Sequence, residues 1–368
     1  MTLPILRPTI AEIDLAKLAR NLRKVRGVVK PGVKLLALVK ANAYGHGAVE
    51  ISQYLEKNHL CEFFGVASVE EGLALRQAGI KNAILVLGSI YPFEAFEYAV
   101  KNNLAITIAS QAAAEAVCKI AEKLGQKALC HVKQDTGMGR IGTRRGKVVG
   151  VIETLAQNPY IILDGLYTHL SSVDSDEAFT EEQIGYYRDT LTHAQLKGIH
   201  INHCHVAASA AIHARPDVHY DMVRPGHSAY GLEKGYEPVL SLKTRIVYVK
   251  DVAAGASISY GRSFITPQPM KVATLPLGYG DGYVRALSNK GEVLVRGQRC
   301  RVLGNVTMDM LMIDITQVPG ASVGDEVVVV GKQGGEEITL AELAQKAGTI
   351  DYELCTLLMP RVPRIYKE

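Results

Sequence analysis

The sequence predicts an α/β protein with a TIM-type (β/α)8 barrel over residues 1–235, followed by a mainly antiparallel β domain over residues 236–368. Three observations support this prediction. Continuous apolar runs alternate eight times with amphipathic stretches in the first part of the chain, which is the pattern of a parallel barrel. In the second part the apolar runs shorten, long helical patterns disappear and glycine-containing turns recur, which indicates antiparallel strands. A length of 368 residues suits a barrel with one smaller domain.

The eight predicted barrel strands are apolar throughout, because a parallel strand is buried on both faces. They cover residues 35–41, 63–68, 83–88, 104–110, 128–135, 163–170, 201–207 and 220–226. Helical periodicity predicts helices over residues 15–29, 48–58, 69–78, 111–124, 145–156 and 177–196. The β domain is predicted to contain strands over residues 240–251, 270–277, 291–295, 298–303, 310–315 and 326–331, and one helix over 339–347. A strand-like segment at 10–14 precedes the first helix, and its sheet cannot be assigned from the sequence.

Composition argues against several classes of protein. Hydrophobic residues make up 48% and charged residues 21% of the chain, as in a soluble globular protein with a large core. A formal net charge of +4 without a basic cluster argues against nucleic-acid binding, and no apolar run is long enough to span a membrane. The six cysteines lack the spacing of a zinc site or a disulfide framework. Because the N-terminus also lacks a signal-like segment, we expect a cytoplasmic protein with reduced thiols.

Lys40 is the first candidate for chemistry, because it follows the apolar run of the first barrel strand. Barrel enzymes carry their active sites at the C-terminal ends of the strands. A lysine at such a place is partly desolvated, which favours the neutral amine that forms imines. Tyr44, Gly45 and Gly47 follow, and the glycines allow backbone amides to approach a ligand closely. The alternative reading is an ordinary lysine that extends to solvent.

Other predicted strands also end in polar residues. Arg140 lies in a glycine-rich loop after the fifth strand, where its fork could bind a carboxylate. His169 closes the sixth strand, and Ser209 follows the seventh with a hydroxyl suited to a phosphate. His203 and His205 project from the same face of the seventh strand and could bind a metal ion. Two histidines do not complete a metal site, so no metal is predicted.

The segment Val39–Gly47 resembles the cofactor-lysine signature of alanine racemases, enzymes that hold pyridoxal 5'-phosphate as a lysine Schiff base. Further matches to this family recur along nearly the whole chain. The resemblance implies that Lys40 forms the Schiff base and that His169 flanks the pyridine ring. By the same resemblance, the cofactor-binding residues are Lys40, Tyr44, His169, Ser209, Arg224, Gly226 and Tyr352.

Segment 222–231 matches the family segment whose arginine meets the ring nitrogen of the cofactor, which assigns that role to Arg224. A permanent cation there disfavours protonation of the nitrogen and weakens the ring as an electron sink. The carbanion then has less time for transamination or decarboxylation, and return of the proton is favoured.

Segment 257–262 resembles the catalytic-tyrosine motif of the family, which makes Tyr260 the second base. Racemisation needs a base on each face of a planar carbanion, so Lys40 would serve D-alanine and Tyr260 L-alanine. The resemblance also implies that Arg140 and the Met308 amide bind the substrate carboxylate. It further implies that Lys133 is carbamylated and holds Arg140. Tyr279 and Asp309 are assigned supporting roles.

In the family, the tyrosine and the methionine come from the partner subunit, so the resemblance implies a homodimer with shared active sites. Four positions depart from the family pattern. Because of them, one polar contact near Ser209 and the charge of the substrate entrance cannot be carried over from the family. These positions are Ala208, His227, Asn305 and Thr307.

The predicted function is interconversion of L- and D-alanine, which supplies D-alanine for cell-wall peptidoglycan. Activity on serine or other small amino acids stays open. One alternative is a basic amino-acid decarboxylase of the same architecture, but it would keep an acid at the position of Arg224. The other is a non-catalytic cofactor-binding barrel protein, and such relatives lack the β domain.

Overall fold

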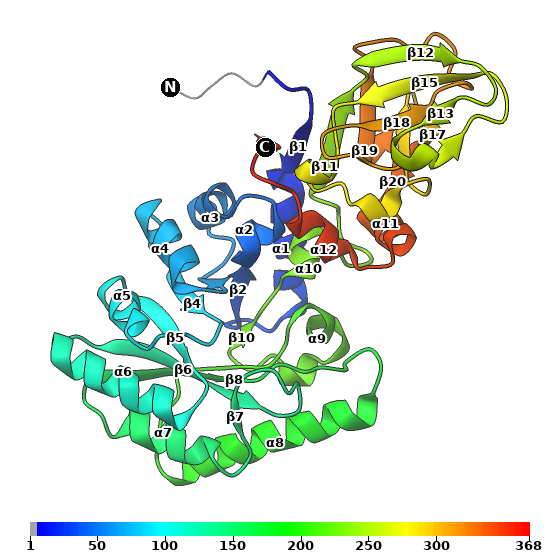
Figure 1. Cartoon of the computed structure of the whole chain (residues 1–368). Helices are drawn as coiled ribbons and strands as arrows, with labels where there is room; N and C mark the ends of the chain where they lie inside the picture. Colours follow the sequence, from blue (N-terminus) through cyan, green and yellow to red (C-terminus); the bar gives the residue numbers. More distant parts are fainter. Residues whose placement is uncertain (1–5) are drawn as a thin grey trace. The chain divides into compact units, whose positions relative to one another are not determined.

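The computed structural model describes residues 6–368, which form two compact units (Figure 1). The barrel unit comprises residues 19–43 and 48–229. The β-rich unit comprises the described chain up to residue 18, residues 44–47 and residues 230–368. The β-rich unit therefore includes three segments that the predicted boundary at residues 235 and 236 left in the barrel: the described chain up to residue 18, residues 44–47 and residues 230–235. Within residues 6–368, no helix is long and apolar enough to cross a membrane.

Eight parallel strands form the barrel in the order β10-β2-β3-β4-β5-β6-β8-β9. Their bounds are β2 (Lys34–Leu38), β3 (Phe63–Val66), β4 (Ala83–Val86), β5 (Leu104–Ile108), β6 (Ala128–Asp135), β8 (Ile161–Tyr167), β9 (His203–His205) and β10 (Met222–Val223). The short strand β7 (Thr143–Arg144) pairs with β6. A parallel bridge between Ala208 and Arg224 links the chain after β9 to the chain after β10. The predicted eight-stranded barrel is confirmed, although the first strand ends at Leu38 rather than at residue 41.

Helices follow most barrel strands, and their ends carry recognisable caps. They are α1 (Leu15–Val28), α2 (Lys40–Tyr44), α3 (Ala48–Lys57), α4 (Val69–Gln77), α5 (Ala95–Lys101), α6 (Gln111–Leu124), α7 (Val148–Ala156), α8 (Glu177–Leu196), α9 (Ser209–Ala214) and α10 (His227–Tyr230). The side chains of Ser68, Ser110 and Asp176 cap α4, α6 and α8 by accepting from backbone amides of the first turn. The short helix η1 (Pro216–Val218) follows α9.

The barrel interior has an apolar part formed by five strands. Leu36, Phe63, Leu85, Ala105 and Met222 make one cluster of buried side chains, with one residue each from β2, β3, β4, β5 and β10. Burial of each larger side chain of this kind contributes about 1.5–3 kcal/mol. The cluster thus stabilises strand positions around the barrel and so holds the strand ends that carry the site.

The β-rich unit contains a ten-stranded sheet with the order β12-β15-β18-β17-β16-β19-β11-β1-β21, and β20 pairs with β19. The strands are β1 (Ile10–Asp14), β11 (Leu240–Arg245), β12 (Tyr248–Val252), β15 (Met270–Leu275), β16 (Glu292–Val295), β17 (Gln298–Leu303), β18 (Leu311–Asp314), β19 (Glu326–Gln333), β20 (Glu336–Ile338) and β21 (Arg364–Lys367). A separate ribbon pairs β13 (Ser257–Ile258) with β14 (Phe264–Ile265). The predicted antiparallel domain is confirmed, with one parallel pair between β1 and β21.

The predicted strand 240–251 is wrong in one respect, because the chain breaks it into β11 and β12. β11 pairs with β19 and β1, whereas β12 pairs with β15. The segment predicted at 10–14 is β1, and it joins this sheet. The remaining elements are the helices α11 (Leu340–Ala347) and α12 (Asp351–Thr356), and the short helices η2 (Tyr260–Arg262), η3 (Tyr279–Asp281) and η4 (Arg285–Leu287).

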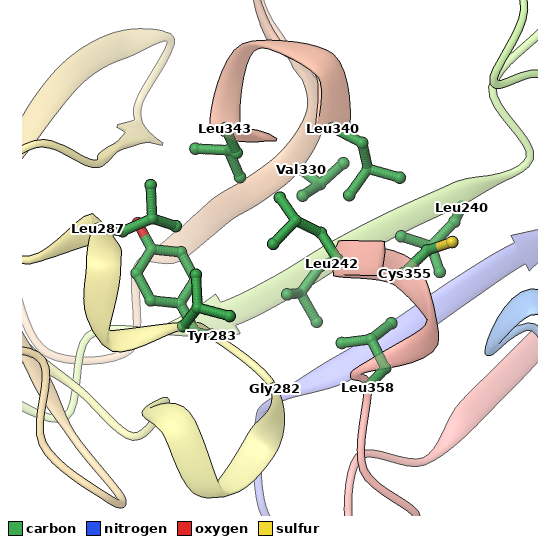
Figure 2. Close-up of a pocket in the computed structure, with 12 residues that line it drawn as sticks. Leu240, Leu242, Gly282, Tyr283, Leu287, Val330, Leu340, Leu343, Cys355 and Leu358 are labelled. Atoms are coloured by element: carbon green, nitrogen blue, oxygen red, sulfur yellow. The ribbon is translucent and has the colours of Figure 1, made fainter. Parts of the chain in front are cut away.

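Apolar side chains fill the space beside α11 and α12. Figure 2 shows Leu240 and Leu242 of β11, Leu343 of α11 and Leu358 around a small pocket. These four leucines are buried. Because its lining is almost entirely apolar, the pocket belongs to the hydrophobic core of the β-rich unit.

Candidate active site

The chain makes an unusual turn after β2. Residues 41–44, none of them glycine, have left-handed backbone angles with φ between 50° and 54°. This conformation costs an L-residue about 1–2 kcal/mol, so other contacts have to stabilise it. The Ala43 amide donates to the Val39 carbonyl at 2.8 Å, and the Ala48 amide donates to the side-chain oxygen of Asn42 at 2.9 Å. Backbone strain is therefore concentrated in the segment predicted to carry the cofactor lysine.

Gly45 ends this turn and has φ 81°. A Cβ at this position would lie 2.0 Å from the carbonyl oxygen of Cys355. Only glycine allows this close approach, since it combines a positive φ with the absence of a side chain. The glycine predicted to bring backbone close to a ligand thus packs against α12 of its own unit.

Glu71 on α4 stabilises the start of the turn. Its carboxylate accepts from the Ala41 amide at 2.7 Å and from the Ala67 amide at 2.6 Å. Glu71→Gln should lower the free energy of unfolding by about 1–3 kcal/mol, because the new amide group presents a donor to one of these two amides. Urea unfolding measures the change, and Glu70→Gln is the control because Glu70 is exposed on the same helix. Equal losses in the two variants would contradict this role.

Lys40 is half-buried at the beginning of the turn. Burial lowers the pKa of its amine, and the cations Arg140 and Arg224 lower it further. The carboxylate of Glu71 partly opposes these effects. A lowered pKa increases the fraction of neutral amine, which is the form that attacks a carbonyl carbon.

Three further cationic side chains lie in this region of the barrel unit. Lys133 is on β6, Arg140 is in the loop after β6, and Arg224 follows β10. Burial, together with the charges of Arg224, Arg140 and Lys40, lowers the pKa of Lys133 to about 7. Burial and the same cations lower the pKa of His169 to about 3, so its imidazole stays neutral. Such a concentration of positive charge favours an anionic ligand.

Arg224 is buried, with 3% of its surface exposed. Its Nη1 donates to Nδ1 of His205 at 2.9 Å and to the His205 carbonyl at 3.0 Å. Its Nη2 donates to the carbonyls of Thr168 and Val206, both at 2.8 Å. Burial lowers the pKa of Arg224 to about 10, so the guanidinium remains a cation at neutral pH. These bonds fix the orientation of the guanidinium plane.

A second polar cluster surrounds Ser209, the first residue of α9. Its hydroxyl oxygen accepts from the Gly226 amide at 3.0 Å and from the Ser228 amide at 3.4 Å. The Ser228 hydroxyl lies 3.2 Å away. All three residues are buried. Buried amides and hydroxyls that converge in this way can bind a phosphate.

The predicted site residues of the β-rich unit differ in exposure. Tyr44 is buried, and its ring centroid lies 5.2 Å from that of Tyr230. Burial, with the neighbouring Cys355 and Tyr352, raises the pKa of the Tyr44 phenol. Tyr352 lies in the first turn of α12. Tyr44 therefore stays protonated and can donate a hydrogen bond at neutral pH.

Three other predicted residues face solvent in the single chain. Tyr260 is 74% exposed, Met308 is 54% exposed and Tyr279 is 43% exposed. Asp309 forms an ion pair with Arg361 at 2.8 Å. Exposure leaves the side chains of Tyr260, Met308 and Tyr279 accessible to a second molecule.

His203 and His205 lie on the same side of β9, as predicted from the alternation of side chains. Their ring centroids lie 6.4 Å and 5.3 Å from that of His131. Nε2 of His203 is 2.7 Å from Nζ of Lys34, and His205 accepts from Arg224. Across residues 6–368, no group of three or more His, Cys, Asp or Glu side chains is arranged to hold a metal ion. The pair belongs to a hydrogen-bond network in the barrel.

No role was predicted for Glu71, Tyr167 or His131, all of which contact site residues. Tyr167 stacks on His205 with an interplanar angle of 5°, and the amine of Lys133 lies 5.2 Å from the Tyr167 ring centroid. For His131 on β6 and Tyr167 on β8, the available signal was a polar residue within an apolar strand pattern, whereas Glu71 lies in helix α4 and had no such signal.

A family model for the alanine racemase N-terminal domain matches residues 13–234, and one for the C-terminal domain matches residues 239–366. The alanine racemase of Halothermothrix orenii is 41% identical over 372 residues, covering 99% of this chain and 98% of the relative. That of Methanococcus maripaludis is 41% identical, covering 98% of each. The structure of alanine racemase from Clostridium difficile 630 has a TM-score of 0.95 and 37% identity, covering 99% of this chain and 97% of that one. The Bacillus anthracis alanine racemase with bound L-Ala-P has a TM-score of 0.92 and 33% identity, covering 100% and 96%.

A parallel barrel with a desolvated lysine among cations, in one chain with an antiparallel β unit, defines an α/β-barrel enzyme with a C-terminal β domain. The matches cover almost the whole length of this chain and almost the whole length of each relative. The chain belongs to the alanine racemase family, whose enzymes depend on pyridoxal phosphate.

Three of the four positions that depart from the family pattern have defined contacts here. Ala208 forms the barrel-closing bridge with Arg224 through backbone atoms, which its side chain does not affect. The side-chain amide of Asn305 donates to the Tyr260 carbonyl at 2.9 Å. The Thr307 hydroxyl donates to the carbonyl three residues further on at 2.7 Å. Asn305 and Thr307 thus stabilise the loops that present Tyr260 and Met308.

Proposed function

We propose that this protein interconverts L- and D-alanine with pyridoxal 5'-phosphate bound through Lys40. The observation that carries the proposal is the half-buried Lys40 amine, with its lowered pKa, among the cations Lys133, Arg140 and Arg224. A neutral amine suits imine formation with an aldehyde, and the cations suit the anionic groups of cofactor and substrate. Both properties belong to residues of a chain that is a member of the alanine racemase family.

The residues present suit the cofactor. Lys40 offers the amine, Ser209 and Gly226 offer a hydroxyl and an amide for the phosphate, and Arg224 offers a buried cation. Tyr44 and Tyr352 supply further phenol donors from the β-rich unit, and His169 remains a neutral ring. When bound, pyridoxal phosphate supplies an electron sink for the charge left at the α-carbon.

Two residues move the proton in the proposed mechanism. The neutral Lys40 amine takes the α-proton of D-alanine, and the side-chain oxygen of Tyr260 takes that of L-alanine from the opposite face. Arg140 and the Met308 amide hold the substrate carboxylate, which orients the α-carbon. Arg224 keeps a positive charge in the site and so limits how long the carbanion survives.

We also propose that Lys133 is carbamylated. Its pKa of about 7 leaves much of the amine neutral, and the neutral amine adds to CO2 to give a carbamate with release of one proton. The product carries a negative charge beside Arg140 and Arg224, so it reduces repulsion within the cation cluster. The carbamate would then hold Arg140 in place. We propose supporting roles in the site for Tyr279 and Asp309, as the family resemblance implies.

We further propose a homodimer in which Tyr260 and Met308 of one copy complete the site of the other. Their exposure in the single chain, 74% and 54%, supports a role at an interface. We propose that the protein acts in the cytoplasm, where it supplies D-alanine for peptidoglycan synthesis.

The test is an assay of purified protein loaded with pyridoxal phosphate. Each alanine isomer is incubated in D2O, and α-proton exchange is followed together with chiral separation of the products. We expect exchange and interconversion from both directions. Release of CO2 without racemisation would instead identify a decarboxylase, and absence of both reactions would identify a non-catalytic cofactor-binding protein.

A further inference from the structure

Four side chains form a continuous line of hydrogen bonds inside the barrel. Nη1 of Arg224 lies 2.9 Å from Nδ1 of His205, whose Nε2 lies 3.0 Å from Nδ1 of His131. Nε2 of His131 lies 3.0 Å from the carboxylate of Asp164. Both histidines are fully buried, and the Asp164 side chain is 14% exposed. The proposed mechanism uses only the arginine of this line.

Arg224 and Asp164 are the two ends of this line, and their chemistry fixes which atom donates in every hydrogen bond. A guanidinium can only donate, so Nδ1 of His205 accepts and its proton sits on Nε2. That Nε2–H donates to Nδ1 of His131, whose own proton must then also sit on Nε2. The His131 Nε2–H donates to Asp164, since a carboxylate can only accept. Both histidines are thereby neutral, and every proton points from arginine to aspartate.

The fold holds these rings in place. A Cβ on Gly165 would lie 2.1 Å from Nδ1 of His131, so the absence of a side chain there makes room for the imidazole. Tyr167 stacks on His205 with a centroid distance of 4.6 Å. The side-chain amide of Asn202 donates to Asp164 at 3.1 Å. Burial opposes ionisation of Asp164, but the hydrogen bonds from His131 and Asn202 act in the other direction and lower its pKa.

We propose that His131 and Asp164 are positioning residues for Arg224, acting by holding His205 as its Nε2–H tautomer. The inference rests on the proposed function, in which Arg224 faces the ring nitrogen of the cofactor. In the opposite tautomer, His205 would direct an N–H at an N–H of Arg224. The guanidinium would then lose its only bond to the His205 ring and meet a repelling N–H there, while its bonds to three backbone carbonyls remain. We expect its orientation to shift and its control over side reactions to weaken.

The first experiment measures the tautomers in the protein without cofactor. Nitrogen-15 NMR of histidine-labelled protein distinguishes Nδ1–H, Nε2–H and doubly protonated rings. We expect His131 and His205 to be neutral Nε2–H tautomers at pH 7. A His205 that is protonated on Nδ1 overturns the proposal, whatever the activity of the protein.

The second experiment uses Asp164→Asn. Asp164 accepts from His131 and from Asn202, and an amide has only one oxygen for these two donors. When the NH2 group faces His131, it donates to Nε2 of His131. The His131 proton then sits on Nδ1 and donates to Nε2 of His205, which leaves the His205 proton on Nδ1. We expect His205 signals of the Nδ1–H form in the apoprotein. In the loaded enzyme, we expect the ratio of transamination to racemisation to rise about tenfold.

His203→Gln is the matched control. Its ring contacts Lys34 and lies 4.0 Å from Asp164, but it is outside the line to Arg224. We expect this variant to keep the parental His205 tautomer and the parental reaction ratio. A change of ratio in both variants, or in neither, overturns the proposal. Correct tautomers in a protein that does not racemise alanine would instead count against the proposed function alone.

Discussion

Tyr260→Phe is expected to reduce racemisation and α-proton exchange of L-alanine by about 10²–10⁴-fold, the usual contribution of a positioned general base. Exchange of the D-alanine α-proton should continue, because Lys40 and the aromatic ring at position 260 remain. Single-isomer exchange in D2O measures the two faces separately. Equal loss of exchange from both isomers would contradict the assignment of one base to each face.

The same variant tests whether sites are shared between subunits. Tyr260→Phe chains are mixed with Lys40→Ala chains under conditions that exchange subunits. In a heterodimer, one site combines the intact Lys40 of one chain with the intact Tyr260 of the other, so activity should return. Homodimers mixed without subunit exchange are the control. Absence of recovery from exchanged subunits would rule out a shared site.

Arg224→Glu is expected to slow racemisation and to raise the proportion of transamination at least about tenfold. A carboxylate in place of the cation favours a proton on the ring nitrogen, which stabilises the carbanion and prolongs its life. Pyruvate release and long-wavelength absorbance report this change.

Arg224→Lys is the matched control for charge. It keeps the cation but cannot reproduce the fork that donates from Nη1 and Nη2 to five acceptors. We expect a lower rate and a reaction ratio between those of the parent and of the glutamate variant, because the charge is kept but its fixed orientation is lost. If the lysine variant shifts the ratio as much as the glutamate variant, charge at this position does not control the reaction.

Much of the barrel could be predicted because its signals are local. Helices α6 and α8 begin and end where periodicity placed them, since Ser110 and Asp176 cap their first turns, and a left-handed Gly125 and Lys197, respectively, follow their last turns. β6 also has its predicted bounds. The short charged strands β20 and β21 could not be predicted, because their stability comes from pairing with β19 and β1.

The candidate site also has features that the sequence could predict and features that it could not. The strand-end positions of Lys40 and Arg224 could be anticipated from the architecture of a barrel. The left-handed turn over residues 41–44 could not, because its sequence is ordinary and a distant carboxylate, that of Glu71, stabilises it. The contact between His131 and His205 joins residues 74 positions apart, so no local pattern reveals it.

Lys40 is the residue that we propose carries the cofactor. Lys133 is the rival within this chain, because it is also buried and its pKa is about 7. Borohydride reduction of the protein loaded with pyridoxal phosphate, followed by peptide mapping, decides between them. We predict a single reduced adduct on Lys40, and an adduct on Lys133 or on any other lysine would contradict the account.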